Sequence, residues 1–163
     1  MTKKIKYGII GAGSMGREHI RNIAIIEEAE IIGLSDPHNI SLQESLSLLE
    51  NDIPTFNNHN ELVNANLADA YIVSSPNFTH IDILKDIIVS NKHLLIEKPL
   101  CTTTNDCKEF KDLTKNYPGM IWTAMEYRYM PPVQKMIKEI HNNRIGKLHM
   151  LSIREHRFPF LKK

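Results

Sequence analysis

The sequence predicts an α/β fold built on a doubly wound parallel sheet. Three observations support this prediction. Short β-rich runs alternate with segments of helical apolar spacing, a glycine-rich turn follows the first run, and polar residues follow several later ones. Strands that alternate with helices form parallel sheets whose two faces the helices cover. Six such strands are enough to complete a sheet of the doubly wound type.

The expected strands are short and helices separate them. Strands are expected at residues 6–10, 30–34, 54–56, 70–73, 94–96 and 120–124. Helices are expected at residues 15–28, 42–49, 61–66, 81–88 and 102–113. Another helix opens at two prolines and carries apolar residues at i, i+3, i+4 and i+7 from Val133 to Ile140. Residues 147–158 are expected to form a last strand, the first of a second α/β domain.

The composition is that of an ordinary globular protein. Of the 163 residues, 42% are hydrophobic and 24% are charged, and 20 Lys and Arg against 19 Asp and Glu give a formal net charge of +1. This balance predicts neither a nucleic acid nor a membrane as a partner. The apolar runs are shorter than a membrane span, and no signal core follows the N-terminus. We therefore expect a cytoplasmic protein, in which Cys101 and Cys107 are reduced thiols rather than a disulfide or a metal pair.

A glycine-rich turn follows the first strand. Residues 11–16, GAGSMG, fit the pattern G-x-G-x-x-G between a strand and a helix. Gly11 permits the tight turn, Gly13 lets the backbone approach a pyrophosphate, and Gly16 lets the helix pack close to the strand. The N-terminus of the helix offers free N–H groups to phosphates. A plain strand–turn–helix is the alternative, but the flanking pattern favours a dinucleotide-binding Rossmann domain.

Asp36 ends the second strand, 20 residues after Gly16. Its carboxylate can accept hydrogen bonds from both hydroxyls of a ribose and repels a 2′-phosphate. The next residues, Pro37, His38 and Asn39, include no arginine that would bind such a phosphate. NAD is therefore favoured over NADP as the cofactor. Asp36 taken alone also fits a turn residue before proline.

A polar loop follows the fourth strand. Ser74, Ser75 and Pro76 lie at the carboxyl end of this strand, where open α/β sheets bind ligands. Asn77 and His80 follow them, either beside the cofactor or as helix-capping or surface residues.

The fifth strand ends in Glu97-Lys98-Pro99. Because the fifth strand is expected beside the fourth, Lys98 would lie next to the nicotinamide end of a bound dinucleotide. Pro99 restricts Lys98 to an extended backbone and stops the strand. The amine could then polarise a substrate oxygen, with Glu97 orienting it. A surface ion pair at a strand end is the alternative, and from the residues alone it is the simpler interpretation.

Five segments carry a resemblance to a known family. "GIIGAGSMGREH", "SDP", "SSPNFTH", "IEKPL" and "MEYRYMPP" occur in this order. The chain resembles the amino-terminal half of the glucose–fructose oxidoreductase / inositol dehydrogenase / rhizopine-catabolism family. The resemblance implies that Gly11, Gly13, Ser14, Met15 and Gly16 bind the pyrophosphate and that Ser74, Ser75, Pro76, Asn77 and His80 line the nicotinamide half. It also implies that Asp36 binds the adenosine ribose, Glu97 contacts the nicotinamide ribose side, Lys98 is the catalytic lysine, and Arg128 closes the cleft.

The function implied by this resemblance is that of an NAD(P)-dependent oxidoreductase. Such an enzyme moves a hydride between the nicotinamide and a CH–OH carbon of a sugar or polyol. Residues 1–125 would be the cofactor domain, and residues 126–163 a crossover helix and the start of a truncated substrate domain. Family members carry their substrate pocket and catalytic base in the second half, so this chain is expected to be inactive alone. A homo-oligomer is compatible with the resemblance if that half is present. A stand-alone dinucleotide-binding regulatory module and a gene remnant are the alternatives.

Overall fold

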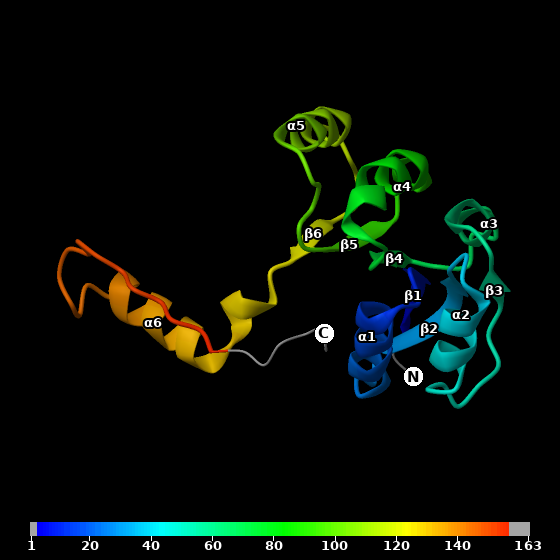
Figure 1. Ribbon diagram of the computed structural model, residues 1–163, viewed down its shortest axis with the longest axis horizontal. Coiled ribbons are helices and arrows are strands. Elements are labelled where there is room, and N and C mark those ends of the chain that lie inside the picture. The colour runs from blue at the N-terminus through cyan, green and yellow to red at the C-terminus, as the bar shows by residue number, and fades with distance from the viewer. Residues whose placement is uncertain (1–2, 157–163) are drawn as a thin grey trace. The chain divides into compact units, whose positions relative to one another are not determined.

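The computed structural model describes residues 3–156. The chain divides into two compact units, Met1–Ala124 and Met125–Lys163 (Figure 1). No helix within residues 3–156 is long and apolar enough to cross a lipid bilayer.

The first unit is built on one six-stranded sheet, as the sequence predicts. The strands are β1 (Ile5–Ile10), β2 (Ala29–Ser35), β3 (Thr55–Phe56), β4 (Ala70–Val73), β5 (His93–Glu97) and β6 (Ile121–Ala124). They lie in the order β3-β2-β1-β4-β5-β6, and every neighbouring pair is parallel (Figure 1). The strand order reverses between β1 and β4, and ligands of open α/β sheets bind at such a switch point. The predicted doubly wound fold is therefore confirmed.

Helices connect the strands of this unit. They are α1 (Ser14–Ala24), α2 (Asn39–Leu46), α3 (His59–Asn64), α4 (His80–Ile87) and α5 (Thr104–Leu113), with short 3₁₀ helices η1 (Asn77–Thr79) and η2 (Ile88–Ser90). Asn58 caps α3 and Thr103 caps α5, because each side chain accepts a hydrogen bond from a backbone N–H in the first turn. Helix α1 ends at Ala24, earlier than the prediction of residue 28, because a tight turn there leads directly into β2.

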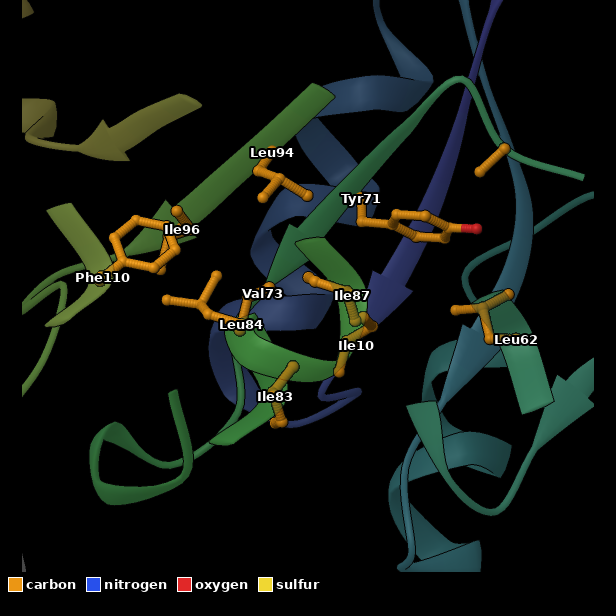
Figure 2. Packing of buried hydrophobic residues seen from close by; sticks show 11 residues of the cluster. Ile10, Leu62, Tyr71, Val73, Ile83, Leu84, Ile87, Leu94, Ile96 and Phe110 are labelled. Atoms are coloured by element: carbon orange, nitrogen blue, oxygen red, sulfur yellow. The ribbon is translucent and has the colours of Figure 1, made fainter. Parts of the chain in front are cut away.

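The core consists of two clusters, one for each face of the sheet. Alternate residues of β4 point to opposite faces: Tyr71 and Val73 belong to one cluster and Ile72 to the other. The first cluster packs β4 and β5 against α3, α4 and α5, and Figure 2 shows Leu84 of α4 and Phe110 of α5 within it. The second cluster packs β1 and β2 against α1 and α2. Both faces of the sheet are thus covered, so the carboxyl edge of the strands presents the loops to ligands.

The second unit contains the 3₁₀ helix η3 (Glu126–Tyr129) and helix α6 (Pro131–His141). The hydroxyl of Tyr127 donates to Glu155 Oε1 at 2.6 Å, which ties the start of this unit to its later residues. The strand expected at residues 147–158 is absent from residues 147–156, and residues 157 and 158 lie outside the described part. This expectation was wrong for residues 147–156 because a strand needs a neighbour to complete its hydrogen bonds, and the described residues of this unit form no other strand.

Candidate functional site: a cleft at the carboxyl edge of the sheet

The glycine-rich turn between β1 and α1 is tightly held. Gly11 has a φ of +96°, a left-handed conformation that favours glycine. A Cβ atom at Gly11 would lie 2.4 Å from the backbone nitrogen of Ser75. The Gly11 N–H donates to the Ser35 carbonyl at 2.8 Å, and the Ser74 hydroxyl donates to the Gly11 carbonyl at 2.7 Å. The turn is therefore fixed to the ends of both neighbouring strands.

Gly13 and Gly16 meet different surroundings. A Cβ atom at Gly16 would lie 2.2 Å from the Gly11 carbonyl oxygen, so only glycine lets α1 start this close to the turn. A Cβ atom at Gly13 would have no atom within 4 Å, so the backbone there borders open space. The first hydrogen bond of α1 runs from the Arg17 N–H to the Gly13 carbonyl. The N–H groups of the helix before Arg17 have no partner within the helix and can bind an anion.

Asp36 follows β2 and points its carboxylate at this turn. Oδ2 accepts from the Ala12 N–H and Oδ1 from the His38 N–H, both at 2.8 Å. Each carboxylate oxygen can accept a second hydrogen bond, so Asp36 can still bind hydroxyl groups. The contact with the His38 N–H is the turn role that the sequence left open for Asp36, whereas the contact with the Ala12 N–H fixes the glycine-rich turn, which the sequence did not indicate.

A cleft of about 790 Å³ opens beside these residues. Eight of the predicted site residues line it: Gly11, Gly13, Ser14, Met15, Asp36, Ser74, Ser75 and Pro76. These residues come from the ends of β1, β2 and β4 and from the start of α1. The volume is in the range of sites that hold small organic ligands. The open backbone at Gly13, the helix N-terminus and the carboxylate of Asp36 fit the phosphates and a ribose of a dinucleotide.

The cleft also has a wall that sequence reasoning missed. The loop after β3 contributes Asn57, Asn58 and His59, and the segment after β4 contributes Phe78, Thr79 and Asp82. Phe78 is 72% exposed, so a large aromatic residue borders the opening. The sequence holds one weak signal for this wall, namely that a polar run follows the predicted third strand.

Glu97 ends β5 and is nearly buried, with 9% of its side chain exposed. Oε1 lies 2.8 Å from Nε2 of His19 in α1, and Oε2 accepts from the Lys98 N–H at 3.2 Å. Burial raises the pKa of Glu97. The hydrogen bond and charge of His19, together with the Lys98 N–H and charge, outweigh burial, so that the pKa lies below its ordinary value. Glu97 is therefore held as an anion between α1 and the loop after β5.

Lys98 and Pro99 follow Glu97 on the surface. Both are exposed, and the peptide bond between them is cis. β5 pairs with β4, so the predicted neighbourhood of these two strands is confirmed. Lys98 and Glu97 do not line the 790 Å³ cleft, which lies on the β1, β2 and β4 side of the unit.

His80 lies inside the first unit and is 0% exposed. Its Nδ1 is 3.0 Å from the Pro99 carbonyl oxygen and its Nε2 is 3.0 Å from the Ser75 carbonyl oxygen. The ring thus joins the loop after β4 to the loop after β5 and does not line the cleft. Gly16 and Asn77 also stay out of the lining. Arg128 belongs to η3 in the second unit and is exposed.

Cys101 follows this loop and is buried. Burial first, and then the neighbouring Cys107, raise the pKa of Cys101 to about 11. The thiol therefore stays protonated at neutral pH. Within residues 3–156, no group of three or more His, Cys, Asp or Glu side chains could hold a metal ion.

Comparison with known proteins agrees with this geometry. The model of the GFO_IDH_MocA oxidoreductase family, described as an NAD-binding Rossmann fold, matches residues 5–125. The chain belongs to this family. The resemblance stated from the sequence is therefore confirmed, and the family is described as one of oxidoreductases.

Individual members of the GFO_IDH_MocA family match most of this chain. The glucose-6-phosphate 3-dehydrogenase of Bacillus subtilis is 32% identical over 152 residues, which cover 93% of this chain and 41% of the relative. The myo-inositol 2-dehydrogenase of Thermotoga maritima is 28% identical over 149 residues, which cover 91% of this chain and 44% of the relative. The crystal structure of a myo-inositol dehydrogenase from Lactobacillus casei, in complex with NAD(H) and myo-inositol, shares the fold. It has a TM-score of 0.82 and 23% identity over 88% of this chain and 43% of that one. The chain spans less than half the length of the curated relatives that it matches.

Proposed function

We propose that the first unit binds NAD in the cleft and serves as the cofactor domain of a sugar or polyol dehydrogenase. The observation that carries this proposal is the convergence of three features on one cleft. These features are the open backbone at Gly13, the free N-terminus of α1 and the Asp36 carboxylate. Each of them suits a different part of a dinucleotide, and they come from separate segments of the chain.

The turn at residues 11–16 would bind the pyrophosphate. Its backbone can approach the phosphates at Gly13, and the first N–H groups of α1 would donate to them. Asp36 would accept hydrogen bonds from the hydroxyls of the adenosine ribose. A carboxylate already fixed by two backbone N–H groups cannot turn away from a 2′-phosphate, which supports NAD over NADP.

The nicotinamide half would lie toward the loops after β4 and β5. Ser74, Ser75 and Pro76 would border it, with Asn77 near them, and Lys98 would face the substrate. Bound NAD accepts or donates a hydride at the nicotinamide ring. The ammonium group of Lys98 would donate a hydrogen bond to the substrate oxygen and so stabilise the charge that develops on it. Residues 126–163 would be the crossover helix and the start of a substrate domain.

The substrate class is proposed from the relatives. Glucose-6-phosphate 3-dehydrogenase and myo-inositol 2-dehydrogenase are named for carbons that carry hydroxyl groups on a polyhydroxylated ring. A secondary alcohol loses a hydride from carbon and a proton from oxygen, and the proton requires a base. We expect that base in the part of the relatives' length that this chain does not span. The 163-residue chain should then bind NADH without oxidising a sugar.

A titration of the pure chain with NADH, followed by the fluorescence of the nicotinamide, tests the binding proposal. Saturable binding that NAD⁺ displaces is expected. Absence of binding at millimolar NADH would contradict the assignment of the cleft. A parallel assay with myo-inositol, glucose and NAD⁺ tests the second part, because measurable reduction of NAD⁺ would contradict inactivity of the chain alone.

A further inference from the structure

The backbone of Lys98 is anchored on both sides. Glu97 before it and Pro99 after it each contact a histidine from a different helix. His19 of α1 contacts the Glu97 carboxylate, and His80 of α4 contacts the Pro99 carbonyl oxygen. The Lys98 side chain itself is exposed. The backbone beneath an exposed side chain on a surface loop is ordinarily poorly fixed. Two buried anchors at the residues on either side of Lys98 therefore call for an explanation.

The contact of His19 with Glu97 sets the direction of the carboxylate. The two groups are 2.8 Å apart, and 15% of the His19 side chain and 9% of the Glu97 side chain are exposed. A carboxylate so little exposed requires a hydrogen-bonded or charged partner. With Oε1 held by His19, Oε2 faces the Lys98 N–H at 3.2 Å. The ring therefore acts on Lys98 through one intermediate side chain.

The contacts of His80 set the other side of the loop. The ring is 0% exposed and lies 3.0 Å from each of two carbonyl oxygens, those of Pro99 and Ser75. Carbonyl oxygens only accept hydrogen bonds, and a neutral imidazole carries one N–H, so the ring donates to one of these oxygens and keeps its other nitrogen beside the second. Ser75 lines the cleft, and Pro99 follows Lys98. His80 therefore fixes the distance between the cleft wall and the lysine loop.

We propose that His19 and His80 are positioning residues that hold Lys98 at a set place relative to the dinucleotide cleft. His19 acts from the helix whose N-terminus would bind the pyrophosphate, and His80 from the helix that follows the cleft wall. A displacement of a reacting group by about 1 Å can lower the rate about a hundredfold. A fixed backbone at Lys98 would therefore serve the reaction. This inference rests on the proposed function insofar as it gives Lys98 a role in the reaction.

The experiment compares the backbone amide of Lys98 in variants by ¹⁵N–¹H NMR and by hydrogen exchange. His19→Leu removes the partner of Glu97, and His19→Gln keeps an N–H donor of similar reach. We expect His19→Leu to shift the Lys98 amide proton upfield and to accelerate its exchange at least tenfold. We expect His19→Gln to restore both values most of the way, and His80→Phe to shift the amide signals of residues 97 to 100 and of Ser75 together.

A matched control separates positioning from stability. Ile20→Val removes one buried methyl group from α1 beside His19 without touching Glu97. A purely structural role of His19 predicts that Ile20→Val and His19→Leu change the Lys98 amide alike, and that result would overturn the proposal. If His19→Leu does not fold, hydrogen exchange of the unmodified chain still tests the proposal. Exchange of its Lys98 amide at the rate of an unstructured peptide would overturn the proposal as well. The NMR readout needs no NADH, so failure of the chain to bind NADH would refute the proposed function without affecting this test.

Discussion

Substitution of two glycines by alanine separates the binding role of the turn from its structural role. Gly13→Ala adds a methyl group to open space at a φ of −72°, which alanine adopts readily. The free energy of unfolding should therefore stay unchanged or rise by about 0.4–1 kcal/mol. The same methyl group would occupy space that a pyrophosphate needs. The dissociation constant for NADH should rise at least about tenfold, which corresponds to about 1.4 kcal/mol.

Gly16→Ala should give the opposite pattern. Its methyl group would lie 2.2 Å from the Gly11 carbonyl oxygen, which is backbone and cannot rotate away. Overpacking of this kind costs about 1–3 kcal/mol, while alanine within a helix regains at most about 1 kcal/mol. A loss of about 2 kcal/mol of unfolding free energy is expected. Any loss of NADH affinity should then follow from the displaced turn.

Urea denaturation and NADH titration of both variants check this reasoning. Asn22→Ala, on an exposed position of α1, is the control and should change neither quantity. NADH affinity of Gly13→Ala equal to that of the original chain would refute binding of the pyrophosphate at this backbone. Equal destabilisation by Gly13→Ala and Gly16→Ala would refute the steric argument.

Three further predictions concern single side chains. Asp36→Ser should lessen the preference for NADH over NADPH. It should also lower the free energy of unfolding by about 1–2 kcal/mol, because two hydrogen bonds from backbone N–H groups are lost. An unchanged ratio of the two dissociation constants would contradict a contact between Asp36 and the ribose. Glu97 has a lowered pKa, so it stabilises the fold above its ordinary pKa of about 4.3, and this contribution is lost as pH falls through the lower folded value. The difference in unfolding free energy between the original chain and Glu97→Gln should therefore narrow on acidification from pH about 7 to about 3. A difference independent of pH would contradict stabilisation of the Glu97 carboxylate by its contacts with His19 and Lys98. Leu84→Ala should lower the free energy of unfolding by about 2–5 kcal/mol because Leu84 is fully buried. Ile40→Ala is the control and should lower it little, because Ile40 is 77% exposed. Similar losses for both variants in urea denaturation would contradict the packing in Figure 2.

Local patterns sufficed for the elements of the first unit. β4 occupies Ala70–Val73 as predicted, because a continuous apolar run bounded by turn residues is typical of a strand buried on both faces. The position of Asp36 after β2 and of the glycine-rich turn after β1 also followed from short stretches of sequence. The end of α1 was less predictable, because Ile25 and Ile26 continue the apolar character of the helix into the turn.

The strand expected at residues 147–158 does not form over residues 147–156, and the reason is different. Its alternating residues fit a strand, but alternation describes only one side of a pairing. Whether a strand forms depends on a neighbour that supplies hydrogen bonds, and nothing in residues 147–158 themselves reports whether that neighbour exists. A local pattern therefore predicts the ability to pair and not the pairing.

By itself, the sequence determined the doubly wound sheet, the dinucleotide turn and the family, because each depends on residues close together in the chain. Only the tertiary structure decided which side chains meet across long separations. His19 and Glu97 are 78 positions apart, and they meet because parallel strands bring the start of α1 and the end of β5 to the same edge of the sheet. The same geometry turned His80 inward to join two loops and gave the cleft a wall from the segment after β3. Local spacing carries no information on such contacts, since they depend on the order in which the strands assemble.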